Sequence, residues 1–283
     1  MQSYRNNSFF QLARTCVAII ADVAGFGPVF PLHAAPDTAS ALEQPDFSGV
    51  WQRANESWFS PVPGDNEGKP LTKLPNDNPE VEAGDYNNRI LQPWAREIVK
   101  ANAEKEQRLQ YVPTAHGTCW PSAVPEVLNL REPVELLQEK DHIVMIYQRD
   151  HQVRWIWLNQ KHSEKVRPSW YGESIGHYEG DTLVVDTIGQ KIDPISVVDP
   201  YGTPHTDKIH VVERYRVVKD AKGKGLEVVF RVEDPGAFTM PWKGTVTYRP
   251  SRGGFEEVVC AENNRTFDGS IFGKMPEKVG SDF

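Results

Sequence analysis

Short runs of alternating hydrophobic and polar residues fill the second half of the chain, and turn-forming residues separate most of these runs. Alternation with a period of two is typical of half-buried β-strands. We therefore expect one strand at 47–52 and eight more after residue 133. The eight are 134–139, 142–148, 152–158, 182–187, 209–218, 226–233, 244–249 and 255–262.

Two segments of the first half carry a different pattern. Residues 60–92 contain five prolines and three glycines without a sustained period, which predicts a long irregular excursion. Pro93 fits the first turn of a helix, and Trp94 and Ile98 follow at helical spacing. One helix is therefore expected at 93–107.

The connections between the predicted strands are mostly short. Parallel neighbours need a crossover of a dozen or more residues, so short connections predict antiparallel pairing. About nine such strands either close into a barrel or split into two packed sheets. We expect an all-β antiparallel barrel with one lateral helix, and a β-sandwich is the alternative. This domain spans 47–267, between a linker at 36–46 and a tail at 268–283.

Composition and charge narrow the class of protein. Of the 283 residues, 39% are hydrophobic and 25% are charged, which is ordinary for a globular chain. The formal charge of −8 and the lack of a Lys/Arg-rich stripe argue against nucleic acid or another polyanion as a partner. The sequence contains no Walker loop, dinucleotide glycine fingerprint, G-x-S-x-G elbow or H-E-x-x-H motif, so we expect no cofactor.

The N-terminus has the features of an export signal. Arg5 and Arg14 precede a mostly apolar stretch that ends in small residues before residue 36. Asp22 interrupts this stretch, so an N-terminal arm of a cytoplasmic protein is the alternative. We expect a signal peptide at 1–35 and a periplasmic or secreted mature chain. No later run has the 18 apolar residues of a membrane span, so no membrane insertion of the mature chain is expected.

Cys119 and Cys260 are the two cysteines that follow the predicted signal peptide. In an exported protein they can form a disulfide that closes a loop of about 140 residues. Chain-entropy arguments give roughly 4–5 kcal/mol of stabilisation for such a closure. Two buried thiols are the alternative.

Several blocks of the sequence resemble known families. Gly49-Val50-Trp51 on the first strand is similar to the start of lipocalin-like barrels. The run 170–187, with its Ser174-Ile-Gly-His-Tyr-Glu-Gly-Asp-Thr-Leu-Val-Val-Asp-Thr187 signature, resembles a large group of exported, mostly uncharacterised bacterial proteins. Blocks at 203–215, 233–242 and 260–265 extend this similarity over residues 45–267. The resemblance implies a lipocalin-like barrel and export, and it implies no particular activity or catalytic residues.

The strand at 209–218 supplies the main catalytic candidate. Glu213 shares the more apolar face of this strand with Ile209, Val211 and Tyr215, so it should point inward. Burial would raise its pKa and let it act as a general acid or base, with Tyr215 donating a hydrogen bond to the substrate. The alternative is a structural ion pair between Glu213 and an arginine such as Arg231.

Other polar candidates lie near this strand. Asp186 ends the strand at 182–187 and either caps a turn or forms a second carboxylate beside Glu213. His205 is a candidate base, oriented by Asp207, at the mouth of the barrel. A metal site that joins His205 to His210 is the weaker alternative, because the two residues are five apart. Surface loop chemistry is the third interpretation of this segment.

Aromatic and imidazole side chains supply candidate ligand contacts. His177 and Tyr178 precede a predicted turn at 179–181, so one of them should face the interior. Trp155 shares a face with Trp157, which suits a core position or a ligand-stacking platform. Trp51 and Trp242 would plug a barrel end or line its mouth.

These observations lead to one functional hypothesis and two alternatives. We expect a cofactor-independent isomerase, lyase or cyclase that acts on a hydrophobic or aromatic small molecule inside the barrel. A periplasmic small-molecule binding or carrier protein without catalysis is the first alternative. A partner-binding domain with a filled barrel is the second.

Overall fold

A computed structural model of the chain describes residues 44–55, 57–149 and 151–260. The predicted signal peptide, most of the linker, the tail and the last residues of the predicted domain lie outside the described residues. Nine strands and one α-helix, α1 (Pro93–Gln107), make up the regular structure of the described part. The strands are β1 (Gly49–Arg53), β2 (Val134–Gln138), β3 (His142–Tyr147), β4 (Gln152–Leu158), β5 (Glu173–Glu179), β6 (Thr182–Ile188), β7 (His210–Asp220), β8 (Gly223–Glu233) and β9 (Trp242–Pro250).

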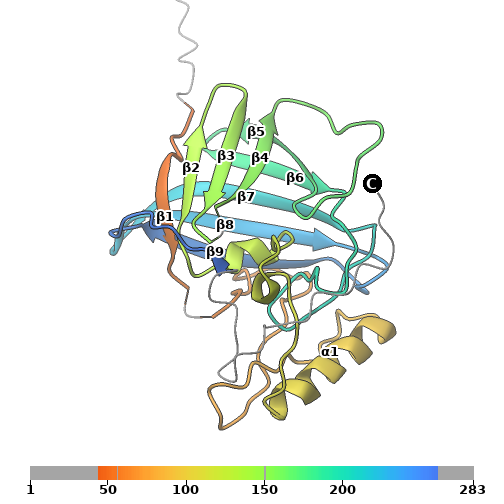
Figure 1. Ribbon diagram of the computed structural model, residues 1–283. Coiled ribbons are helices and arrows are strands. Elements are labelled where there is room, and N and C mark those ends of the chain that lie inside the picture. Colours follow the sequence, from red (N-terminus) through yellow and green to blue (C-terminus); the bar gives the residue numbers. More distant parts are fainter. Residues whose placement is uncertain (1–43, 56, 150, 261–283) are drawn as a thin grey trace, which may run out of the picture. The chain divides into compact units, whose positions relative to one another are not determined.

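The nine strands form a closed barrel in sequence order, with β9 paired back to β1 (Figure 1). This closure confirms the predicted barrel with its helix, and a sandwich of two separate sheets is excluded. Neighbouring strands are antiparallel except for β4 and β5, which run parallel. We call the junction of these two strands the seam.

The seam is the part of the wall that the sequence did not predict. Its register joins three residues of each strand, from Ile156 opposite Ser174 to Leu158 opposite Gly176. A side chain at Gly176 would lie only 3.0 Å from Ile156 Cγ2, so glycine permits the close approach of the two strands. Residues 159–172 return the chain from the end of β4 to the start of β5, which makes the parallel pairing sterically feasible.

Two strand predictions differ from the structure. The whole of β5 was missed, because no strand was predicted directly before the turn at 179–181. The turn itself is present, and Gly180 has a φ of 62° there. The strand predicted at 255–262 is not formed in its described part, where Val258 makes a single bridge to Arg149.

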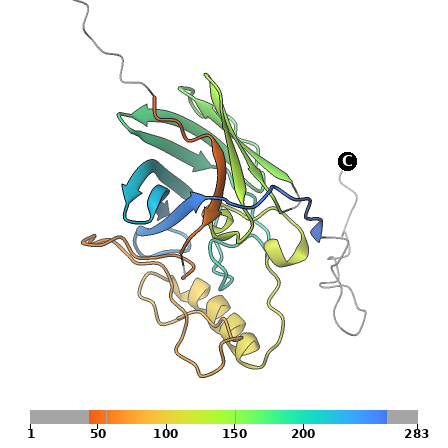
Figure 2. The same cartoon turned by 90° about the vertical axis from the view of Figure 1, so that its left-hand side faces the viewer.

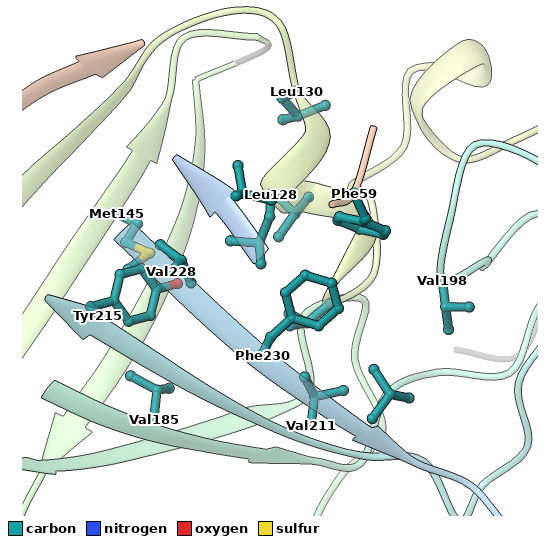
Figure 3. Close-up of a cluster of buried hydrophobic side chains, with 14 of the residues drawn as sticks. Phe59, Leu128, Leu130, Met145, Val185, Val198, Val211, Tyr215, Val228 and Phe230 are labelled. Carbon is teal, nitrogen blue, oxygen red and sulfur yellow. The ribbon is translucent and has the colours of Figure 1, made fainter. Parts of the chain in front are cut away.

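The barrel interior is filled with side chains from facing strands. Figure 3 shows Met145, Val185, Tyr215, Val228 and Phe230 converging on this core. Each leaves at most 2% of its surface accessible, so these side chains leave no space among them for a ligand. The expectation of a ligand cavity inside the barrel is therefore wrong at this part of the core.

The helix has its predicted bounds but presents a different face. Ala95, Val99 and Ala103 are buried, whereas Trp94 and Ile98 are 43% and 40% exposed. Small side chains on the inner face let the helix approach the segment at 60–92, and the two lie beneath the barrel in Figures 1 and 2. The sequence pattern was misleading here because the largest apolar side chains lie on the solvent side.

Candidate functional site

Glu213 points into the barrel, as its strand pattern predicts, and it is fully buried. Arg154 on β4 binds it with two hydrogen bonds, Nη1 to Oε1 at 3.0 Å and Nη2 to Oε2 at 2.5 Å. The Tyr215 hydroxyl donates to Oε1 at 2.6 Å. The remaining Arg154 donors reach Ser174 Oγ and Thr187 Oγ1. The Arg154 guanidinium and the Tyr215 hydroxyl, which surround this carboxylate, therefore make their hydrogen bonds to other side chains of the barrel.

This arrangement favours a structural role for Glu213 over proton transfer. Burial alone would lower the pKa of Arg154, but the Glu213 carboxylate raises it well above its ordinary value. Burial and the same carboxylate raise the pKa of Tyr215 well above its usual range. A bidentate guanidinium–carboxylate pair is among the strongest hydrogen-bonded contacts in proteins. The structural ion pair is thus the better interpretation, with Arg154 as the partner, while Arg231 pairs with Glu67 and Glu233 instead.

Asp186 lies on the outer face of the barrel and does not approach Glu213. Leu183, Val185 and Thr187 point inward from β6, so the alternate residue Asp186 points outward. Although β6 and β7 are neighbours, their two carboxylates lie on opposite sides of the wall. The predicted carboxylate pair is therefore wrong.

His205 is buried in the loop before β7, where Asp207 is exposed and does not orient it. Its Nδ1 lies 3.0 Å from the Thr206 carbonyl and therefore donates, so Nε2 accepts from the Ser196 hydroxyl at 2.9 Å. Burial lowers the pKa of His205 and favours the neutral ring. These contacts fix the loop and leave no ring nitrogen directed at a ligand.

The aromatic candidates fall into two groups. Trp51 and Trp242 are buried core residues, 2% and 1% exposed, and Tyr178 faces inward and stacks on Phe47 at 6.4 Å. His177 points outward, so the expectation that one residue of this pair faces the interior is confirmed. Trp155 has the opposite environment, on the outer wall beside the seam.

A groove of about 460 Å³ follows the outer side of the seam, and we call it the seam groove. Trp155 and Trp157 are 47% and 39% exposed, with ring centroids 5.5 Å apart and planes within 14°. A core position for this pair is therefore wrong. The other lining residues are Val153, Arg154, Ser163, Lys165, Arg167, Ser169, Tyr171, Gly172, Glu173 and Ser174.

Polar groups on the far side of the seam groove form a hydrogen-bonded chain. Glu173 Oε1 lies 2.9 Å from His162 Nδ1, and Asp186 Oδ1 lies 2.9 Å from His162 Nε2, so the ring bridges the two carboxylates. His210 Nε2 reaches the same Asp186 oxygen at 3.0 Å, and its Nδ1 lies 3.7 Å from Glu233. We call Glu173, His162, Asp186 and His210 the imidazole relay.

The relay alternates carboxylate and imidazole groups. Burial alone would raise the pKa of Asp186, but hydrogen bonds from His210 and His162 bring it below its ordinary value. The bond to Asp186 raises the pKa of His210. Glu173 also has a lowered pKa, because Ser163 and His162 bonds outweigh its burial. Two residues that the sequence analysis proposed, Asp186 and His210, therefore lie in one site. The sequence analysis did not identify the other two members of this site, His162 and Glu173.

A second group of acids was missed because nothing in its local pattern marks it. Glu126 lies in a short 3₁₀ segment, Glu126–Asn129, and is 5% exposed. Burial raises its pKa to about 8, and the nearby Asp199 adds to this effect. Burial also raises the pKa of Asp199 to about 6. The adjoining hollow has only about 120 Å³, room for a few water molecules.

Cys119 and Cys260 form a disulfide, as predicted for an exported chain. The bond ties the segment after β9 to the loop that follows η1 (His116–Thr118). It closes a sequence separation of 141 residues.

No protein-family model matches the chain, and no curated protein matches its sequence. The resemblance to exported bacterial proteins stays a prediction. Within the described ranges, no helix is long and apolar enough to cross a membrane. The same residues contain no cluster of three or more His, Cys, Asp or Glu side chains suited to a metal ion.

Proposed function

We propose that the protein binds a hydrophobic or aromatic small molecule in the seam groove. The observation that carries this proposal is the pair of exposed, parallel rings of Trp155 and Trp157 in one hollow. Large aromatic side chains normally lose their contact with water on folding, so two of them exposed side by side suggest an interaction surface. The groove volume of about 460 Å³ falls within the usual range for small-molecule sites.

The polar rim of the seam groove supports a ligand with a polar end. Lys165 and Arg167 line it, and neither makes an ion pair with another described residue. Glu173 lines the opposite part, with its carboxylate held by Ser163 and His162. A few fixed polar groups around an apolar platform orient a bound molecule. This ligand therefore combines a flat apolar part with one or two hydrogen-bonding groups.

Binding of N-phenyl-1-naphthylamine, a neutral aromatic fluorophore, tests the platform. The double variant Trp155→Ala/Trp157→Ala should weaken its binding about tenfold, since each stacked aromatic contact contributes about 0.5–1.5 kcal/mol. Trp94→Ala is the matched control, because Trp94 is 43% exposed on α1. An equal loss in the control, or no loss in the double variant, would exclude the seam groove. Mass spectrometry of molecules that co-purify with the parent but not with the double variant then identifies natural ligands.

Acid–base catalysis at the same groove is the second candidate, and the imidazole relay favours it. His162 lies between two carboxylates, one of which lines the seam groove. Such a chain can carry a proton between the groove and His210. Incubation of a co-purified ligand in D₂O should then introduce deuterium at carbon, and Glu173→Gln should abolish this exchange while retaining binding. Exchange that is absent in the parent would leave a binding protein without catalysis.

We also propose that the protein works in the periplasm or outside the cell. The disulfide between Cys119 and Cys260 supports this, because disulfides persist in oxidising compartments.

A further inference from the structure

A second hollow, of about 970 Å³, lies at the junction of β1 and β9, beside the turn that precedes β8. Thr247 and Arg249 alternate with the inward-pointing Tyr248, whereas Arg53 and Lys224 alternate in step with the inward-pointing Trp51 and Leu226. Residues from both faces of the wall therefore line the hollow at the strand ends. We call it the basic groove. Its charged lining residues are Arg53, Lys222, Lys224, Arg249, Arg252 and Glu256.

The basic groove has a charge opposite to that of the molecule. Its six charged residues, five cations and one glutamate, carry a formal charge of +4. Because the whole chain has a formal charge of −8, the remainder of the chain carries −12. The cations come from β1, from the turn between β7 and β8, from the start of β8, from β9 and from the segment after β9. Folding therefore gathers charges that no stripe in the sequence reveals. A concave wall with one sign of charge concentrates ions of the opposite sign.

Most of these cations make no direct ion pair with a carboxylate in the described part of the chain. Arg249 is the exception, since it pairs with Asp220. Arg53, Lys222, Lys224 and Arg252 make no ion pair with a described residue. Lys224 and Lys222 interact with the carboxylates of Asp46 and Asp220 through charge attraction, without a direct ion pair.

Aromatic rings hold two of the cations in place. Lys224 Nζ lies 5.3 Å from the centre of the Trp51 ring, and Arg53 Cζ lies 5.2 Å from that of Trp58. Arg131 lies 5.4 Å from the same Trp58 ring, so two guanidinium groups share one aromatic neighbour. Burial lowers the pKa of Arg53, and the charge of Arg131 lowers it further. Bringing like charges together costs free energy, which an anion bound to Arg53 in the basic groove would offset.

We propose that the basic groove binds a compact polyanion, a small molecule with at least two phosphate, sulfate or carboxylate groups. Arginine forks and lysine ammonium groups are the usual ligands of such groups. A long polymer such as nucleic acid fits less well, because the cations are confined to one hollow and the rest of the chain repels it. The site involves strands other than those of the seam groove, so it does not depend on the function proposed there.

Titration calorimetry with sodium tripolyphosphate tests the proposal. We expect binding at 20 mM NaCl that weakens about tenfold or more at 200 mM, because salt screens charge contacts. Charge reversal in Lys222→Glu/Arg252→Glu should weaken it about tenfold. Both residues are exposed, and far-ultraviolet circular dichroism checks that the fold is retained.

The matched control is Lys140→Glu/Lys208→Glu, which changes the net charge equally at two exposed positions outside the basic groove. It should alter the affinity for tripolyphosphate less than about twofold. An equal loss in both double variants would mean attraction to overall charge and would overturn the site. Absence of tripolyphosphate binding at 20 mM NaCl would overturn it as well. Dextran sulfate binding more tightly than tripolyphosphate, without regard to the Lys222 and Arg252 charges, would overturn the preference for a compact ligand.

Discussion

At the scale of single residues, Glu126 shows how burial changes the chemistry of a carboxyl group. It is nearly inaccessible to water, and its carboxyl oxygen accepts one hydrogen bond, from Asn129 at 3.3 Å. Its pKa of about 8 means that the folded protein keeps it protonated at neutral pH. In the unfolded chain the same group ionises near 4.5.

The pH dependence of Glu126→Gln follows from this difference. Because the folded state holds a proton that the unfolded state has released, stability falls as the pH rises from about 4.5 to about 8. By pH 7 this loss is on the order of 3 kcal/mol. The glutamine cannot ionise, so thermal unfolding should show the variant gaining several degrees on the parent between pH 4.5 and 7.5. Glu104→Gln, at a half-exposed site on α1, should show no such gain, and a flat difference for Glu126→Gln would refute the burial argument.

At the scale of elements, the ion pair of Arg154 and Glu213 joins β4 to β7 across the interior of the barrel. Ser174 on β5 and Thr187 on β6 accept from the same guanidinium, so four consecutive strands meet at one side chain. The pair thereby compensates for the short register at the seam.

Glu213→Gln should lower the free energy of unfolding by about 3–5 kcal/mol, since it leaves Arg154 buried without its counter-ion. Urea denaturation measures this loss. The double variant Arg154→Met/Glu213→Leu removes both charges and should be more stable than the single one. Glu179→Gln breaks the exposed pair with Arg214 and should cost less than about 1 kcal/mol. A similarly small effect of Glu213→Gln would contradict the structural role.

The sequence predicted elements better than contacts. Alternation located eight of the nine strands and the inward face of Glu213, because a period of two fixes sides locally. It missed β5, because the inward face of this strand is Ser174, Gly176 and Tyr178 and has no run of apolar side chains. The partner of Glu213 was out of reach, because Arg154 is 59 residues away and only the barrel register brings them together. The seam groove and basic groove likewise depend on which strands become neighbours.

At the scale of the whole molecule, the disulfide restrains the end of the described chain. Replacing both Cys119 and Cys260 by serine frees a loop of 141 residues, which should lower stability by roughly 4–5 kcal/mol. Dithiothreitol should lower the melting temperature of the parent toward that of the double variant and leave the variant unchanged. If the parent melts at the same temperature with and without reductant, the bond does not stabilise the fold.

The number of strands has a consequence of its own. Antiparallel pairing reverses direction at each step around a ring, so a closed ring with purely antiparallel neighbours must contain an even number. Nine strands therefore require at least one parallel pair, and this chain has it between β4 and β5. Parity thus explains why the wall has an irregular junction, where the aromatic groove lies. A homologous barrel with one strand more or fewer would lose that requirement and could lose the groove with it.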